Sequence, residues 1–263
     1  VHNEVLDLGN LEFMQHNVVI NSLTPLRSAV GHPWYSYYVL KTEGIFQSQE
    51  EIDNFTWRDP ETGIKQKVQP NAKPGDFKYV DFNNDGKITD DDKQYLGSYM
   101  PKITFGFGGN LQWKGIDFSF QFQGVGKSTV YNGFKQMGYT GRGQGGNMLA
   151  DVKNSWEYNK TSGVPRIGLI SDPNGNYNSL NDFFLEDASY LRLKNVTIGY
   201  TLPDNVMRAI GLPGSTARFY LNGENLFTAT DYSGIDPEVG NFGIDGGTYP
   251  VARSFSIGFN FSF

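Results

Sequence analysis

"RSFSIGFNFSF", residues 253–263, carries the pattern that decides the fold of this chain. Large apolar side chains stand at every second position, and small or polar side chains fill the positions between them. The apolar positions are Phe255, Ile257, Phe259, Phe261 and Phe263. Because successive side chains of a strand point to opposite faces, this alternation predicts a β-strand with one apolar face.

The same alternation recurs upstream of the last strand. Residues 103–113 and 116–123 both show it, and the sequence "WKGID" between them is short enough to form a hairpin turn. Residues 203–211 contain the start and stop signals of a short helix. Further strands are predicted at about 11–20, 35–46, 190–202 and 217–228. The chain is therefore predicted to be all-β, with about seven antiparallel strands.

The connections between these strands alternate in length. Long polar segments cover residues 47–101, 128–187 and 229–250, whereas the connections near 114 and 208 are short. Between the apolar positions the strands carry Ser, Thr, Asn, Gln and Gly, which suit a hydrated lumen. Together these features predict part of a transmembrane β-barrel with long extracellular loops and short periplasmic turns.

Composition excludes several other classes of protein. The 263 residues include 15% aromatic residues and 32 glycines but no cysteine, which excludes disulfides and thiolate metal sites. A net charge of −6 argues against nucleic acid as a partner. There is no apolar run of about 18 residues, as a spanning helix requires. The chain begins with Val and shows no leader, so we expect a mature form or a fragment.

Several stretches resemble a known family. They are "VGHPWYSYYVLKTEGIFQSQEEID" (30–53), "DFNNDGKITDDDKQYLGSYMPKITFGFGGNLQWKGIDFSFQFQGVGKSTVYN" (81–132), "ASYLRLKNVTIGYTLP" (188–203), "RFYLNGENLFTATDYSGIDPEV" (218–239) and the terminal "FSIGFNFSF". In this order they resemble the C-terminal region of the SusC/RagA-type TonB-dependent outer-membrane transporters of Bacteroidetes. The resemblance extends over nearly the whole chain.

The resemblance implies a fold and a function. Such transporters have a barrel of about 22 strands with a plug inside, so residues 1–263 would form a C-terminal part of the barrel without the plug. The implied function is uptake of glycans, oligosaccharides or peptides through the outer membrane of a Gram-negative cell. The implied partners are a SusD-like surface lipoprotein, the TonB complex acting through the missing plug, the barrel-assembly machinery and outer-membrane lipid.

An alternative from another class is a secreted, calcium-stabilised, β-rich binding or adhesion module. The two interpretations differ in what the phenylalanine rows contact: lipid in a transporter, and one another in a soluble module. An enzyme is not expected, because no catalytic constellation is present. "GRGQGG" (141–146) matches a dinucleotide fingerprint only formally, since no βαβ unit surrounds it.

"DFNNDGKITDDD", residues 81–92, has the spacing of a twelve-residue calcium loop. Gly86 stands at the position of the sharp turn, and Ile88 is expected to anchor the loop on its neighbours. We expect bound Ca²⁺ to have a structural role, because residues 47–101 are too long to order themselves from their own apolar contacts. The expected ligands are Asp81, Asn83, Asp85, the Lys87 carbonyl, Thr89 and Asp92.

Other side chains are candidates for contact with ligands or partners. Phe263 resembles the terminal aromatic residue that the barrel-assembly machinery reads. The acidic residues Glu224, Asp231, Asp236 and Glu238 have no catalytic spacing and are interpreted as loop structure or ligand contacts. Aromatic residues in the predicted outer loops could stack on a sugar, pack on a partner protein or equally pack inside their own loops: Trp57, Trp156, Tyr158 and Tyr177.

Overall fold

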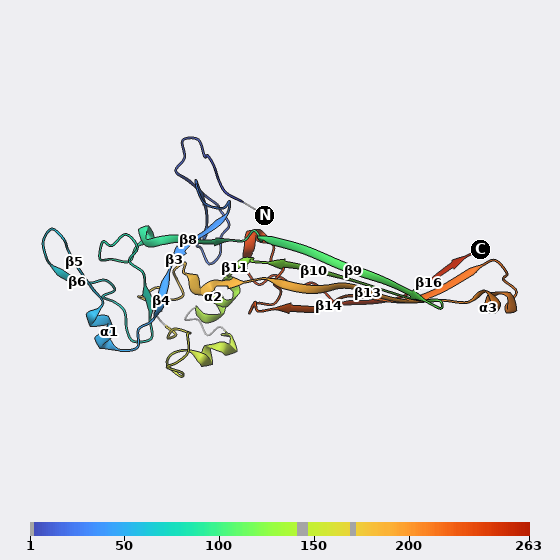
Figure 1. Ribbon diagram of the computed structural model, residues 1–263. Coiled ribbons are helices and arrows are strands. Elements are labelled where there is room, and N and C mark those ends of the chain that lie inside the picture. Colours follow the sequence, from blue (N-terminus) through green and yellow to red (C-terminus); the bar gives the residue numbers. More distant parts are fainter. Residues whose placement is uncertain (1–2, 141–146, 169–171) are drawn as a thin grey trace.

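One five-stranded antiparallel sheet dominates the computed structural model, which describes residues 3–140, 147–168 and 172–263. Its strands lie in the order β16-β14-β13-β10-β9, so each strand pairs with its neighbours in the meander. Figure 1 shows them side by side as one elongated sheet. The strands are β9 (Ile103–Trp113), β10 (Ile116–Gly126), β13 (Tyr190–Thr201), β14 (Thr216–Thr230) and β16 (Ser254–Ser262).

The two faces of this sheet differ completely in polarity. One row across all five strands consists of Leu111, Phe118, Ile198, Leu221 and Ile257. The adjacent row, on the opposite face, consists of Asn110, Ser119, Thr197, Asn222 and Ser256. We call these the apolar face and the polar face. The register thus confirms the alternation predicted from the sequence.

The connections are also arranged as predicted. Lys114 and Gly115 join β9 to β10 in a two-residue turn, and both have positive φ angles (49° and 83°), as a type I′ hairpin requires. Helix α3 (Asp204–Ala209) joins β13 to β14 at the same end. The long connections gather at the opposite end, which we call the loop end (Figure 1).

Five of the seven predicted strands form the long sheet, and the other two segments do not. β1 (Phe13–Gln15) and β3 (Ser36–Leu40) belong to a separate sheet with β2 (Leu26–Ala29) and β8 (Lys93–Ser98). The reason is visible in β3, which is buried on both faces. Its Tyr37 is fully buried, and the Tyr37 hydroxyl donates to the carbonyls of Thr129 and Gly243. Alternation alone does not reveal such burial.

The hydrophobic core of the chain lies in the loop end, and the long sheet has none of its own. The main cluster comprises Ile20, Leu26, Tyr37, Val39, Tyr131, Tyr139, Tyr177, Leu180, Phe184 and Ile244. The loop end also holds the short elements α1 (Gln49–Asn54), α2 (Gly133–Thr140), β4 (Thr42–Ile45), β5 (Thr56–Arg58), β6 (Lys65–Lys67), β7 (Phe77–Tyr79), β11 (Thr129–Asn132), β12 (Leu185–Asp187) and β15 (Ile244–Asp245). 3₁₀ turns cover Asp90–Asp92, Ala150–Asn154, Asp182–Phe184 and Asn241–Gly243.

Residues 47–101 take part in two small apolar clusters, each of which also contains a buried residue from outside the segment. Ile52 and Ala72 pack with Phe46 in one cluster. Phe77 and Tyr79 pack with Leu40 in another, and Ile88 contacts this second cluster. The prediction that Ile88 anchors the acidic loop is thereby confirmed. The segment is ordered by several small clusters rather than by one core.

A buried arginine attaches the connection 231–253 to the sheet. Arg192 of β13 is 2% exposed, and its guanidinium lies 2.6 Å from the Asp236 carboxylate and 2.7 Å from that of Glu238. It also donates to the Thr228 hydroxyl. Burial raises the pKa of Asp236, but hydrogen bonds from the backbone of Glu238 and Val251 and from Arg192 outweigh it, so the net pKa is lowered. Both carboxylates therefore serve loop structure.

Within the described residues, no helix has the length and apolar character needed to cross a bilayer.

An introduced charge should lower the free energy of unfolding much more on the apolar face than on the polar face. Phe120→Arg places a cation on the apolar face, where insertion in lipid costs about 2–4 kcal/mol near the midplane. Gln121→Arg, one residue further on, places the same cation on the polar face and should cost far less. Urea unfolding of the full-length protein in lipid vesicles measures both. Equal destabilisation by the two variants would contradict this assignment of the faces.

The arginine attachment yields a second prediction. Arg192→Met leaves the Asp236 carboxylate without its cation, while Lys194 stays paired with Glu238, and breaking such a buried pair typically costs about 3–5 kcal/mol. Limited proteolysis should then cleave within 231–253 much faster than in the unmodified protein. Arg208→Met, which removes an exposed arginine, is the control and should leave that cleavage rate unchanged.

Candidate functional site

The centre of the polar face is a network of uncharged side chains. The Asn222 amide oxygen accepts hydrogen bonds from the Asn195 amide (2.8 Å) and the Thr197 hydroxyl (2.8 Å). A hollow of about 510 Å³ lies beside it, where Gly106 and Gly108 leave the backbone of β9 bare. These groups can offer hydrogen bonds to a polar solute without attracting charge.

Near the short turns, the polar face carries an ion pair that crosses a strand. Arg218 of β14 contacts the Asp117 carboxylate of β10 at 2.8 and 2.5 Å. Gly199 of β13 lies beneath the pair, and a Cβ there would come within 2.5 Å of the Asp117 carboxylate. The glycine allows both charged side chains to lie flat on the sheet. The charges at this end of the face are thus paired with each other.

An aromatic stack stands at the loop end. His16, Tyr35 and Phe242 lie ring upon ring, with centroids 3.9 and 4.5 Å apart. Tyr35 and Phe242 both have positive φ angles (55° and 56°), which bulky residues rarely adopt. Burial lowers the pKa of His16, which favours a neutral ring. Backbone strain of this kind concentrates at functional sites. No local sequence pattern predicts this stack, because its members come from three distant segments.

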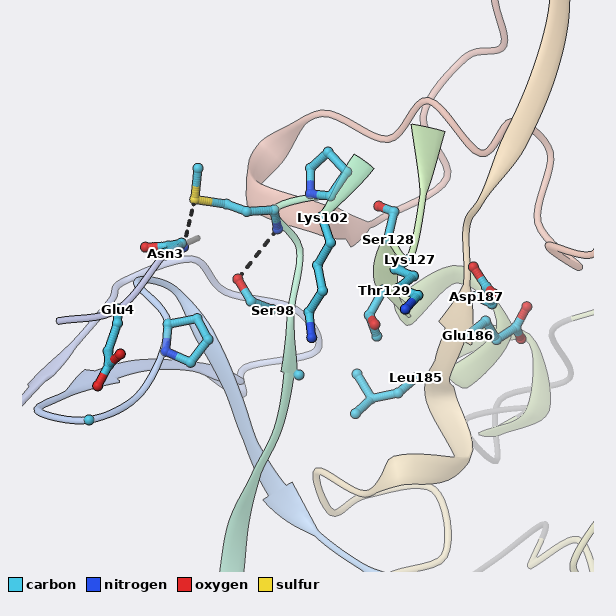
Figure 2. A pocket seen from close by; sticks show the side chains of 15 residues that line it. Asn3, Glu4, Ser98, Lys102, Lys127, Ser128, Thr129, Leu185, Glu186 and Asp187 are labelled. Carbon is cyan, nitrogen blue, oxygen red and sulfur yellow. Dashed lines mark hydrogen bonds between the residues drawn. The ribbon is translucent and has the colours of Figure 1, made fainter. Parts of the chain in front are cut away.

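A cavity of about 670 Å³ lies where the long sheet meets the loop end. Figure 2 shows that its lining comes from the N-terminal segment, the end of β8, the junction of β10 with β11, and β12. The Lys102 side chain extends between Ser98 and Leu185. Lys127 and Asp187 lie on the β10–β12 side. The cavity thus presents charges of both signs.

Glu186, which also lines this cavity, belongs to a polar network behind it. Its carboxylate accepts from the Lys135 ammonium (2.9 Å) and from the backbone and hydroxyl of Ser233. Burial raises the pKa of Glu186, but these hydrogen bonds outweigh it, and the net pKa lies below the ordinary value. The network joins β12 to the connection 231–253, so the walls of the cavity depend on it.

The predicted calcium loop forms a compact turn. The Asp81 carboxylate accepts from the backbone N–H of Asp85 and Gly86, and the Asp85 carboxylate accepts from that of Lys87. Asn83 also accepts from the Asp85 N–H. Gly86 has φ +81°, as the sharp turn needs, and the Trp57 ring packs against it.

The last two expected ligands are engaged in a helix cap. Asp92 is fully buried and accepts from the backbone N–H of Phe82, Asn83 and Thr89. The Thr89 hydroxyl accepts from the Asp91 N–H. In the described ranges, no three or more His, Cys, Asp or Glu side chains are grouped as a metal site. The oxygen donors that Ca²⁺ prefers are therefore present in one turn, with their lone pairs directed to the backbone.

The four loop aromatics have different surroundings. Tyr158 is 79% exposed, as expected. Trp57 and Trp156 are half-buried: Trp57 packs on Gly86, and the Trp156 indole donates to Gln47. Tyr177 is 2% exposed, and its hydroxyl donates to the Pro165 carbonyl. Of the two possibilities for Tyr177, ligand contact or packing inside the loops, the structure shows packing, because the ring belongs to the core.

The positions of the remaining predicted site residues follow from the strands that carry them. Phe263 is 99% exposed beyond the end of β16. Glu224 accepts from the Ser254 hydroxyl across the β14–β16 pair. "GRGQGG" (141–146) lies outside the described residues.

Comparisons with known proteins identify relatives of this arrangement. No family model matches the chain. The TonB-dependent receptor P26 of Formosa agariphila is 36% identical over 99% of the chain and 26% of that receptor. The TonB-dependent receptor SusC of Bacteroides thetaiotaomicron is 29% identical over 76% of the chain and 19% of that receptor. These named relatives are receptors, not enzymes.

Solved structures agree with the sequence relatives. A chain of the RagAB peptide importer in its closed-closed state matches with a TM-score of 0.69 and 27% identity, over 97% of this chain and 25% of that chain. The open-open state matches with a TM-score of 0.67. The chain spans between about a fifth and a quarter of the length of these relatives. It is a partial β-barrel homologous to the SusC/RagA-type TonB-dependent receptors.

Proposed function

We propose that this chain forms part of the wall and outer loops of a TonB-dependent receptor, which takes up a glycan, oligosaccharide or peptide through the outer membrane. The observation that carries the proposal is the bare apolar face. Leu111 and Ile257, at opposite edges of one row, are 67% and 84% exposed, and no second sheet of the described chain covers them. Strands of 9 to 15 residues are long enough to cross a bilayer.

The same observation weighs against the alternative of a secreted β-rich module. A soluble module must bury its large apolar face, because leaving such a patch in water is unfavourable. Here the buried core lies in the loop end instead. A lipid-facing sheet accounts for both facts.

The polar face is proposed as a section of lumen wall. Its centre holds amides and hydroxyls, and the charges of Asp117 and Arg218 neutralise each other in an ion pair. The loop end, with the aromatic stack and the cavity of Figure 2, is proposed as the surface that meets ligand. Tyr158, Trp57 and Trp156 remain proposed contacts there.

Partners are proposed from the relatives. RagAB is a peptide importer. By analogy, a SusD-like lipoprotein would cover the loop end, and TonB would act through a plug. Phe263, exposed at the end of β16, is proposed as the contact for the barrel-assembly machinery.

We further propose that residues 81–92 bind Ca²⁺ with a structural role. Asp81, Asp85 and Asn83 supply hard oxygen donors within one turn, and Gly86 gives that turn its shape. When bound, the cation would draw these oxygens together and neutralise their charge. The β5–β6 hairpin, which packs on Gly86 through Trp57, would be stabilised with it.

Uptake is tested in cells. A strain that lacks the full-length receptor should lose energy-dependent accumulation of one class of solute, either fluorescent neutral oligosaccharides or fluorescent peptides, and complementation should restore it. A protonophore should abolish the restored uptake, since TonB requires the proton gradient. Equal accumulation of both classes with and without the receptor would count against the proposed function.

Calcium is tested on the purified full-length receptor. Ca²⁺ titration by calorimetry should give a dissociation constant on the order of 10⁻⁴–10⁻³ M or tighter, as for extracellular calcium modules. Asp85→Ala should abolish this binding and increase protease cleavage within 47–101. Asp91→Asn removes an exposed charge outside the ligand set and should leave binding intact. Absence of Ca²⁺ binding in the unmodified receptor would refute the site.

A further inference from the structure

Helix α3 presents an unpartnered apolar stripe. Val206 of α3 and the C-cap residue Ile210 stand four residues apart and so share one side of the helix, and Leu212 follows after Gly211. These side chains are 37%, 58% and 41% exposed. Met207, on another side of the helix, is 1% exposed. The helix lies beyond the ends of β13 and β14, at the end with the short turns (Figure 1).

Burial shows on which side of the sheet α3 lies. Ala217 is an apolar-face position, since it pairs with Phe261, and it is only 5% exposed. Ser215, two residues earlier, is also buried, whereas Thr216 between them is exposed on the polar side. Only the apolar side of this strand end is therefore covered. Because α3 contacts β14 and Met207 is buried, α3 is the element that covers it.

The surroundings of α3 have the composition of a membrane interface. Trp113, the last residue of β9, lies at the same end of the apolar face and is 64% exposed. The Lys114 ammonium stands 4.9 Å from the centre of its ring. Trp is enriched where acyl chains meet headgroups, and Lys extends its charge toward the headgroups there.

We propose that α3 is an interfacial helix, which inserts Val206, Ile210 and Leu212 at the boundary between acyl chains and headgroups of the periplasmic leaflet. The occupant is lipid because the stripe continues the apolar face of the sheet. Asp204 and Arg208, four residues apart on a separate side, remain in the headgroup layer. The inference rests on the proposed membrane location of the sheet.

Site-directed spin labelling tests the proposal in the full-length receptor in phospholipid vesicles. Residues 1–263 contain no cysteine, so each introduced cysteine is the single label site of this region. Ile210→Cys and Leu212→Cys place labels on the stripe, and Asn205→Cys places one on the polar side of the same helix. Leu221→Cys, on the apolar face of the sheet, reports the lipid environment itself.

Accessibility to oxygen, which partitions into lipid, is compared with accessibility to a water-soluble nickel chelate. Labels at 210 and 212 should favour oxygen several-fold over the label at 205. Preference for the nickel chelate at 210 and 212 would show that the stripe faces water, and protection from both reagents would show that protein covers it; either result overturns the proposal. The label at 221 distinguishes failure of the α3 proposal from failure of the proposed membrane location of the sheet. Nickel access at 221 would contradict the membrane location itself.

Discussion

The structure depends on one constraint, namely that a strand surrounded by hydrocarbon must find all its backbone hydrogen bonds in neighbouring strands. The meander β9-β10-β13-β14-β16 satisfies this for its three inner strands, and within the described residues β9 and β16 pair on one side only. The constraint also fixes register, because a shift by one residue would turn the Leu111–Ile257 row into the lumen. A sheet with these properties needs further strands beside it, as the barrels of its longer relatives provide.

A sheet with one face in lipid and one in a lumen, as proposed for this chain, cannot build a core. Burial therefore moves to the loop end, where aromatic residues from distant segments pack around Tyr37 and Tyr131. The attachments between the two regions are polar. Arg192 of β13 holds the connection 231–253 through the carboxylates of Asp236 and Glu238. Buried ion pairs of this kind specify one geometry, because breaking them leaves an unpaired charge.

The sequence predicts the sheet well and the loop end poorly, for a physical reason. Strand alternation is a local signal with a period of two, so residues 103–123 and 253–263 reveal both faces by themselves. Packing in the loop end depends on contacts between segments far apart in the chain. Tyr177 and Tyr158 look alike in sequence, yet one is in the core and the other is exposed. The His16–Tyr35–Phe242 stack joins three such segments, and no local pattern announces it.

This division also locates selectivity. The wall offers amides, hydroxyls and bare glycine backbone, and its Asp117–Arg218 pair neutralises itself. Glycans and peptides both carry neutral hydrogen-bonding groups, so under the proposed function such a wall would let either class pass without preference. Discrimination requires groups that differ in shape or charge. Those stand at the loop end, where Phe242 ends the aromatic stack and Lys127 and Asp187 line the cavity. Under the proposed function, the ligand carried would therefore be set by the loops rather than by the wall.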